Sequence, residues 1–312
     1  MRQLVTANST LLATDAAQAS ASRNYAVRIA GGLAAAFYAG QGPGLASAPA
    51  MASQPVQQSE TKCRPGILPV NGNRIWARRQ GAGHVTVVFE AGFGNDSRVW
   101  NDVEPRIRAE GVQTLVYDRA GMGHSTIDTH LGYSLDNDVQ ILRAVLSDCG
   151  IPAPVIFVGH SYGGAIGLAA AVQDPRIKGL VLLDAVVPGV WSQHEVAKNL
   201  AAMRPQYDDI RKQTPDLAQV AIPWAEAMPR MATEINALDV PDDLPVIEIA
   251  AEKGQTDPDS ARTWRAAQTA FVAGHPARSF VLAKGSSHKI MNDKPDLVVS
   301  EIQHMILRVY SK

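Results

Sequence analysis

The stretch PVIFVGHSYGGAIGLAAAV, residues 154–172, joins a short apolar run to an Ala-rich run through a turn that contains glycine. The apolar run is typical of a buried strand, and the Ala-rich run predicts a helix. Ser161 stands between them, with Gly159 and Gly163 two positions away on either side. A serine on so sharp a strand-to-helix turn has a strained backbone, and its hydroxyl group projects above the sheet. We therefore predict that Ser161 is a nucleophile.

The pattern G-x-S-x-G is a weak signal by itself, because a chain with 25 glycines can contain this spacing by chance. The alternative interpretation is a glycine-lined turn whose serine has no chemical role. The position of the pattern between an apolar strand and a helix favours the nucleophile, since the mechanism requires this local context.

Strand and helix patterns alternate from Gly66 to the end of the chain. The predicted strands are residues 72–81, 84–92, 112–121, 154–161, 178–186, 245–251 and 278–283. The predicted helices are residues 103–111, 135–150, 165–174, 260–274 and a closing helix that begins near Pro295. Continuously apolar strands that alternate with helices imply a parallel sheet that is covered on both faces. The predicted fold class is therefore α/β, a mostly parallel sheet with helices on both faces.

Residues 61–312 are predicted to form one domain, because a single sheet accounts for every segment except residues 187–243. That segment has helical patches and lies between two strand ends on the carboxyl side of the sheet, where ligands bind in open α/β folds. We expect it to form a helical lid over a substrate pocket. The prolines expected to interrupt its helices are Pro205, Pro215, Pro223 and Pro229. The side chains that line this pocket, or else form the core of the lid, are Trp191, Met203, Tyr207, Trp224 and Met228.

The first 60 residues are rich in Ala, Ser, Gly and Gln and show no periodicity. Arg23 and Arg28 precede an apolar run at residues 29–40, and small residues follow at 48–52. This order is that of a secretory signal peptide. We predict that residues 1–60 are a leader with a signal peptide and a disordered segment, and that the protein is periplasmic or secreted. The alternative is a cytoplasmic protein with an Ala-rich leader that targets nothing.

The net charge of -1 and the lack of long runs of one sign argue against nucleic acid or an anionic membrane as a partner. The apolar run of the leader is shorter than the roughly 20 residues of a stable membrane span. Cys63 and Cys149 form either a disulfide or two unrelated thiols. Since the chain has neither a CxxC pair nor a Cys/His cluster with metal spacing, we predict no metal site.

A serine hydroxyl is a poor nucleophile until a neighbouring base takes its proton, and histidine suits this role near neutral pH. Among the eight histidines, His288 is the best placed. It lies in a loop between the strand of residues 278–283 and the final helix. His160 adjoins the serine, but we expect it to pack beneath the turn.

Attack on a carbonyl group produces an oxyanion, which backbone N–H groups can stabilise by about 3 kcal/mol each. Tyr162, the residue after the nucleophile, supplies one such group. The loop EAGFGNDS, residues 90–97, follows a strand and offers Phe93 as the second donor, with Gly92 and Gly94 allowing the loop to turn inward. We predict an oxyanion hole formed by Phe93 and Tyr162; the alternative for the loop is a plain glycine turn.

Five segments resemble the α/β-hydrolase fold superfamily, in its lidded branch of serine esterases and related hydrolases. They are VVFEAGFGNDSRVW (87–100), VYDRAGMGHS (116–125), PVIFVGHSYGG (154–164), GLVLLDAV (179–186) and GSSHKIMNDKPDLV (285–298). The resemblance covers nearly the whole chain after Gly66. It implies that Asp118 and Arg119 support a turn at the carboxyl edge of the sheet. It is much less specific for the substrate than for the fold.

The resemblance also implies a third catalytic residue, an acid that orients the histidine and lies between the serine and the histidine in the chain. Many relatives carry it a few residues after the strand that follows the lid, where this chain has Gly254. We favour Asp184, at the end of the strand before the lid, over Asp257, and give Glu252 little weight. The alternatives are that Asp184 caps the lid loop and that Asp257 caps a helix.

These inferences predict a serine hydrolase that cleaves a carboxylic ester or related acyl bond through an acyl-enzyme, with no cofactor and no metal. The expected partner is a small-molecule acyl substrate; the oligomeric state is not predicted. One alternative is the same triad acting on a peptide, a lactone, a carbon–carbon bond or in perhydrolysis. Another is a receptor that binds a small ligand on the same fold without turnover.

Overall fold

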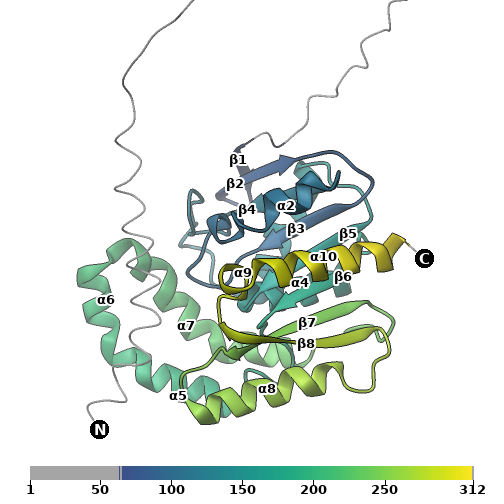
Figure 1. Ribbon diagram of the computed structural model, residues 1–312. Helices are drawn as coiled ribbons and strands as arrows, with labels where there is room; N and C mark the ends of the chain where they lie inside the picture. Colours follow the sequence, from purple (N-terminus) through teal and green to yellow (C-terminus); the bar gives the residue numbers. More distant parts are fainter. Residues whose placement is uncertain (1–62, 64, 311–312) are drawn as a thin grey trace, which may run out of the picture.

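The computed structural model describes residue 63 and residues 65–310 (Figure 1). The leader, residues 1–60, lies outside the described residues, so its signal peptide and the export of the protein stay predictions. Within the described part of the chain, no helix is both long and apolar enough to cross a membrane.

The described residues form an eight-stranded sheet with the order β1-β2-β4-β3-β5-β6-β7-β8. β2 pairs antiparallel with β1 and β4, and all other neighbouring strands are parallel. The strands are β1 (Gly66–Val70), β2 (Asn73–Gln80), β3 (Thr86–Glu90), β4 (Gln113–Tyr117), β5 (Val155–His160), β6 (Ile177–Leu183), β7 (Val246–Lys253) and β8 (Arg278–Ser287). The predicted, mostly parallel sheet is confirmed.

Helices cover both faces of this sheet and enclose two apolar cores. Buried side chains of α3 (Leu135–Asp148), α4 (Tyr162–Gln173) and α8 (Pro258–Val272) belong to one core. Those of α2 (Glu104–Ala109), α9 (Ile290–Asp293) and α10 (Pro295–Tyr310) belong to the other. Figure 1 shows α2, α9 and α10 together in front of the strands. The predicted α/β class is confirmed.

The register of the central strands brings three chain segments to one place. β3 and β5 are buried over their whole length, as expected for parallel strands with both faces covered. Glu90 at the end of β3 pairs with Gly159 in β5, and His160 pairs with Leu183 at the end of β6. The loops that follow β3, β5 and β6 are therefore neighbours at the carboxyl edge of the sheet.

β1 precedes the first predicted strand and was not predicted. β1 pairs with β2 through a two-residue turn, in which Asn71 has φ 46° and Gly72 has φ 79°. The dipeptide Asn-Gly is the preferred sequence for this kind of hairpin turn, because both residues adopt positive φ readily. That dipeptide was the available signal for β1.

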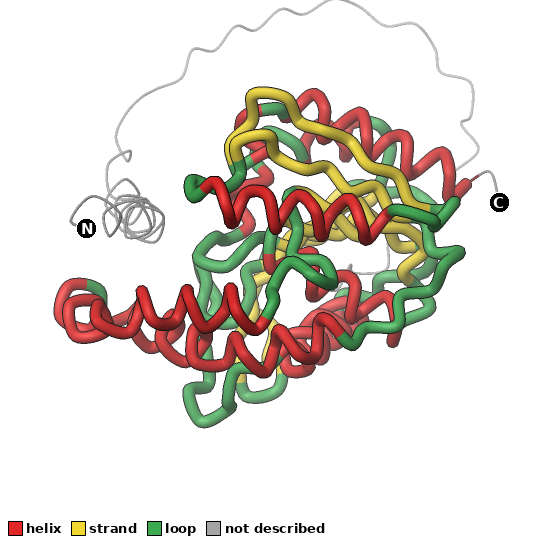
Figure 2. Tube along the Cα trace, turned by 90° about the horizontal axis from the view of Figure 1, so that it is seen from below, coloured by secondary structure: helices red, strands yellow, loops and turns green. Residues whose placement is uncertain are grey.

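Three α-helices lie between β6 and β7 in the chain, where the lid was predicted. They are α5 (Gln193–Met203), α6 (Tyr207–Gln213) and α7 (Pro215–Asn236), with the 3-10 helix η2 (Arg204–Gln206) between α5 and α6. Figure 1 shows them on the side of the molecule away from β1 and α2, and Figure 2 shows them as a helical layer beside the sheet. Their role as a lid over a substrate pocket stays a prediction.

Two of the four predicted helix breaks are wrong. Pro205 lies in η2 and Pro215 begins α7, as expected for helix ends, but Pro223 and Pro229 lie inside α7. A proline inside a helix removes one hydrogen bond and costs about 3 kcal/mol. α7 continues because its apolar face, which includes Trp224, is buried in the core that also contains side chains of α3, α4 and α8.

Cys63 and Cys149 form a disulfide, which the sequence analysis had left open. The bridge connects the segment before β1 to the residue that follows α3, 86 positions later in the chain. Arg79 strengthens the same junction, because its Nη1 donates to the carbonyl oxygen of Cys149 at 2.8 Å. The disulfide therefore holds the edge of the sheet to a helix of one face.

We expect that replacing both cysteines by alanine lowers the free energy of unfolding by about 4 kcal/mol, because the open chain gains the entropy that an 86-residue loop closure removes. Urea unfolding of the wild type and of Cys63→Ala/Cys149→Ala measures this difference. A reducing agent should destabilise the wild type and leave the variant unchanged. An equal effect of the reducing agent on both proteins would contradict the prediction.

Candidate active site

The turn around Ser161 has the strained geometry that its glycines predicted. Ser161 directly follows β5 and precedes α4, with φ 53° and ψ −123°. A Cβ atom on Gly159 would lie 2.8 Å from the carbonyl oxygen of Gly163, and one on Gly163 would lie 2.7 Å from that of Ala91. Such contacts are too short for real side chains, so only glycine fits both positions. The half-buried serine is thereby held at the carboxyl edge of the sheet.

The loop after β3 packs directly against this turn. A Cβ atom on Gly92 would lie 2.7 Å from Nδ1 of His160 and 3.1 Å from Cβ of Ser161. Phe93 is the next residue of this loop, and Tyr162 is the first residue of α4. The two residues predicted to form an oxyanion hole therefore flank Ser161 from different elements. Their donation to an oxyanion stays a prediction.

His288 and Asp184 meet at the same edge. Nδ1 of His288 lies 2.7 Å from Oδ2 of Asp184, although 104 positions separate them in the chain. Asp184 follows β6 with φ 43°, and only 1% of its surface is exposed. His288 follows β8, which extends four residues beyond the predicted strand end. The predicted base and the favoured acid are thus in contact.

His160 connects the serine turn to His288. The rings of His160 and His288 lie 4.6 Å apart between centroids, and Nε2 of His160 lies 2.9 Å from the carbonyl oxygen of His288. Burial lowers the pKa of His160 well below its usual value, and the adjacent His288 lowers it further. A neutral His160 then donates from Nε2, which agrees with the packing role expected for it. Because His160 adjoins Ser161, these contacts bring His288 to the region of the nucleophile.

Asp257, the other candidate acid, has different partners. It is the N-cap of α8, where Oδ2 accepts from the backbone N–H of Ser260 and from Nζ of Lys198, both at 3.0 Å. These hydrogen bonds lower the pKa of Asp257 to about 2. The helix-cap interpretation accounts for the contact with Ser260, and Lys198 of α5 adds an ion pair. Glu252 contacts neither catalytic candidate and accepts from the backbone N–H of Gly285.

Gly254 stands where related sequences were expected to carry the acid, and its backbone lies beside Asp184. A Cβ atom on Gly254 would lie 2.2 Å from Oδ2 of Asp184. A carboxylate from position 254 and the carboxylate of Asp184 therefore need the same space. There is room for one carboxylate here, and it is that of Asp184, which follows β6.

Arg119 supports the loop after β3, in line with the structural role expected for the segment around it. Its Nη1 donates to Oε1 of Glu90 at 2.6 Å and to the carbonyl oxygen of Ala91 at 2.8 Å, and Nη2 donates to the carbonyl oxygen of Gly92 at 3.1 Å. In a planar trans peptide the C=O and the next N–H point in opposite directions. By holding the oxygen of Gly92, Arg119 therefore sets the direction of the N–H of Phe93.

Asp118 supports the neighbouring loop. Oδ1 of Asp118 accepts from the backbone N–H of Ser97 at 2.8 Å, and Oδ2 accepts from that of His124 at 2.9 Å. A Cβ atom on Gly123 would clash with this carboxylate, which explains the glycine. The segment of residues 116–125 thus ties the loop after β3 to the loop after β4.

A buried acidic group that the sequence analysis missed completes this network. The hydroxyl of Tyr162 donates to Oδ2 of Asp138 at 2.7 Å, and the guanidinium of Arg119 lies over the Tyr162 ring at 5.4 Å. One guanidinium thus neighbours two buried carboxyls, those of Glu90 and Asp138. Burial raises the pKa of both acids, to about 8 for Glu90. The signal for Glu90 was a charged residue that ends a continuously apolar strand.

We expect the free energy of unfolding to fall as the pH rises from about 4.5 to about 8, because folding raises the pKa of Glu90 from 4.5 to about 8. Between these values the folded protein binds a proton that the unfolded chain has released, so the stabilisation is complete below the lower pH and is lost toward the upper one. Glu90→Gln should reduce the decrease by on the order of 5 kcal/mol. Urea unfolding at several pH values tests this.

Glu110→Gln is the matched control, because Glu110 is exposed. It should keep the pH dependence of the wild type. If Glu90→Gln keeps it as well, Glu90 does not take up the proton.

Four aromatic rings gather beside the serine turn. The ring of Phe93 stacks on that of Trp224 in α7, with 3.8 Å between centroids and 15° between planes. Trp191 stacks on Tyr162 at 5.8 Å and meets Trp224 edge to face at 5.7 Å. Two of the predicted lid side chains therefore contact the predicted oxyanion residues. Met203, Tyr207 and Met228 pack in the same apolar core.

Comparisons with known proteins indicate the family of the chain. The model of the alpha/beta hydrolase family matches residues 87–301. The uncharacterized protein YqjL of Bacillus subtilis is 25% identical over 229 residues, which are 70% of this chain and 83% of that protein. The putative carbamate hydrolase RutD of Pseudomonas savastanoi is 34% identical over 116 residues, 37% of this chain and 42% of that protein.

Among solved structures, a thermophilic esterase from Thermogutta terrifontis superposes with a TM-score of 0.57 at 19% identity, covering 76% of this chain and 94% of that one. At this identity the likeness shows the fold alone. The family model covers more than half of the chain, and the chain therefore belongs to the alpha/beta hydrolase family. Hydrolase activity on a small molecule follows as its general function.

Proposed function

We propose that the protein is a serine hydrolase that cleaves a carboxylic ester or related acyl compound through an acyl-enzyme. The observation that carries the proposal is the 2.7 Å contact between Asp184 and Nδ1 of His288, at the same sheet edge as the strained turn of Ser161. A carboxylate that holds Nδ1 of the histidine leaves Nε2 to accept the proton of the serine. This is the arrangement that activates a serine hydroxyl.

In the proposed reaction Ser161 attacks the carbonyl carbon while His288 takes the hydroxyl proton. Asp184 orients His288 and stabilises its protonated form. The N–H groups of Phe93 and Tyr162 stabilise the oxyanion, with Arg119 holding the peptide that carries the first of them. His288 then gives its proton to the leaving alcohol. Water attacks the acyl-enzyme by the same route, with His288 again as the base, and releases the acid.

The aromatic rings beside Ser161 support an apolar acyl group as substrate. The rings of Phe93, Tyr162, Trp191 and Trp224 contact one another beside the nucleophile, with Phe93 partly exposed and the other three buried. Aromatic side chains favour apolar ligands through burial of surface. Because a curated relative bears the name of a putative carbamate hydrolase, carbamates are a second acyl class worth assaying.

We expect the wild type to release p-nitrophenol from p-nitrophenyl esters over many turnovers, and Ser161→Ala to lower kcat by at least about a thousandfold, because the variant has no nucleophile. A series of acyl chain lengths identifies the preferred acyl group. Ser147→Ala, in which an exposed serine of α3 is removed, should match the wild type. Binding of acyl compounds without turnover would instead support a receptor on the same fold.

The acid can be identified with two matched substitutions. We expect Asp184→Asn to lower kcat by at least about a hundredfold, because an asparagine misorients His288, and Asp257→Asn to stay within about threefold of the wild type. Both variants keep the size of the side chain, and thermal unfolding checks that both are folded. A large loss in Asp257→Asn alone would assign the role to Asp257 instead.

A further inference from the structure

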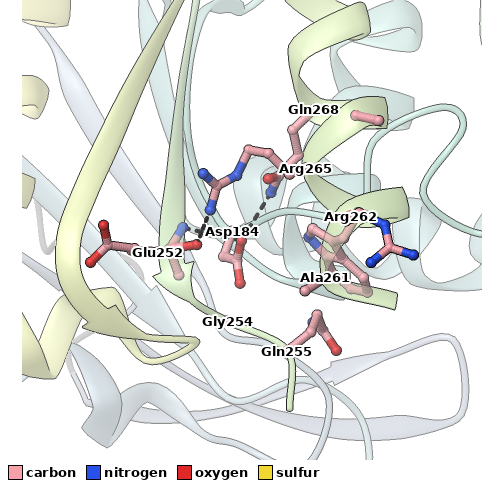
Figure 3. A pocket seen from close by; sticks show the side chains of 11 residues that line it. Asp184, Glu252, Gly254, Gln255, Ala261, Arg262, Arg265 and Gln268 are labelled. Carbon is pink, nitrogen blue, oxygen red and sulfur yellow. Dashed lines mark hydrogen bonds between the residues drawn. The ribbon is translucent and has the colours of Figure 1, made fainter. Parts of the chain in front are cut away.

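Asp184 borders a cavity of about 550 Å³. The cavity lies between the end of β7 and α8, and Asp184, Gly254, Trp264, Arg265 and Gln268 are among the residues that line it. Figure 3 shows Gln268 reaching from α8 to the carboxylate of Asp184. The acid is therefore contacted from two sides, by His288 on one and by a helix on the other.

Gln268 is a bridge between two buried carboxyls. Its Nε2 donates to Oδ1 of Asp184 at 3.0 Å and to Oε1 of Glu248 at 2.9 Å. An amide nitrogen has two hydrogens, so both bonds can form at once. The backbone N–H of Ala251 donates to the same Oδ1 at 3.2 Å. Gln268 is completely buried, as is Glu248.

The two carboxyls differ in their hydrogen-bond partners. Oδ2 of Asp184 contacts Nδ1 of His288, whereas Oε2 of Glu248 has no hydrogen-bond partner among the described residues. Burial raises the pKa of Glu248 well above its usual value, and the neighbouring Asp184 raises it further; the N–H of Ala185, Gln268 and Arg265 act in the opposite direction. Burial and the adjacent carboxyl of Asp184 therefore both favour the neutral form of Glu248.

We propose that Gln268 is a positioning residue that holds Asp184 against His288, while Glu248 anchors the other hydrogen of the amide as an uncharged acid. The inference rests on the proposed function and adds to it. The acid follows β6 here, instead of lying at position 254. Its Oδ2 contacts His288, and its Oδ1 is held by Gln268 and by the N–H of Ala251. A misplaced carboxylate would misorient the imidazole and slow the chemical step without affecting substrate binding.

The first experiment compares Gln268→Leu with Thr269→Val, a control on the exposed side of the same helix. We expect Gln268→Leu to lower kcat for an ester about tenfold or more with little change in KM, and Thr269→Val to match the wild type. Gln268→Met, of similar length, replaces Gln268→Leu if that variant does not fold. Equal kcat values in the wild type and a folded Gln268 variant overturn the proposal.

The second experiment tests the charge of Glu248. If Glu248 is neutral, Glu248→Gln keeps both hydrogen bonds to Oε1 and changes no charge, so the acidic limb of the pH profile of kcat/KM stays in place. If Glu248 is charged, its removal shifts the limb to lower pH, because a nearby negative charge favours the protonated histidine. A shift of that kind overturns this part of the proposal.

The third experiment uses formate as a replacement for the carboxylate. Asp184 has φ 43°, a conformation that glycine adopts without strain, so Asp184→Gly should keep the backbone and open the site to the cavity. We expect formate to restore part of the lost kcat/KM in Asp184→Gly. In Asp184→Gly/Gln268→Leu the restoration should be about tenfold weaker, because the donor that holds formate is missing. Equal restoration in both variants overturns the proposal.

A measurement on the free protein separates this inference from the proposed function. The proton between Nδ1 of His288 and Asp184 should give a far-downfield proton resonance in the wild type and in Thr269→Val, and a shifted or broadened one in Gln268→Leu. This readout needs no substrate. Full activity of Ser161→Ala would refute the proposed function, whereas an unchanged resonance in Gln268→Leu would refute only the role of Gln268.

Discussion

The close approach of the loop after β3 to the turn after β5 is the constraint on which the rest of the site depends. It follows from the register of two parallel strands, which places Glu90 beside Gly159. At this distance neither Gly92 nor Gly163 can carry a side chain. The backbone amides of the loop after β3 and the hydroxyl of Ser161 therefore lie together at the carboxyl edge of the central strands. His288 and Asp184 lie at the same edge of the sheet.

Two pairs of buried carboxyls lie near this edge of the sheet, and in each pair one polar side chain lies beside both acids. Arg119 neighbours both Glu90 and Asp138, and Gln268 bridges Asp184 and Glu248. A buried charge is costly without a partner, so a single polar group beside two acids favours a neutral form for one of them. The stability of the fold therefore depends on pH through buried acids such as Glu90 and Glu248, whose pKa values burial raises.

The parts of the site that were predictable are those that follow a strand directly. Ser161 and His288 could be found because a short apolar run precedes each and a helix pattern follows. Gln268 also left a signal, since it shares the inner face of α8 with Phe271, where a polar residue is unexpected. The sequence favoured Asp184 over Asp257 but left the second open, because Asp184 follows β6 directly and Asp257 lies in the segment between β7 and α8.

Local patterns were sufficient for the α/β class, for the strained serine turn and for the best-placed histidine, because periodicity and turn chemistry depend on residues close together in the chain. The partners of each charged group depend on strand order and register, which join positions as distant as Asp184 and His288. Only the folded chain therefore brings His288 to Asp184 and keeps α7 continuous through Pro223. Those outcomes rest on packing between elements, and no short stretch of sequence encodes it.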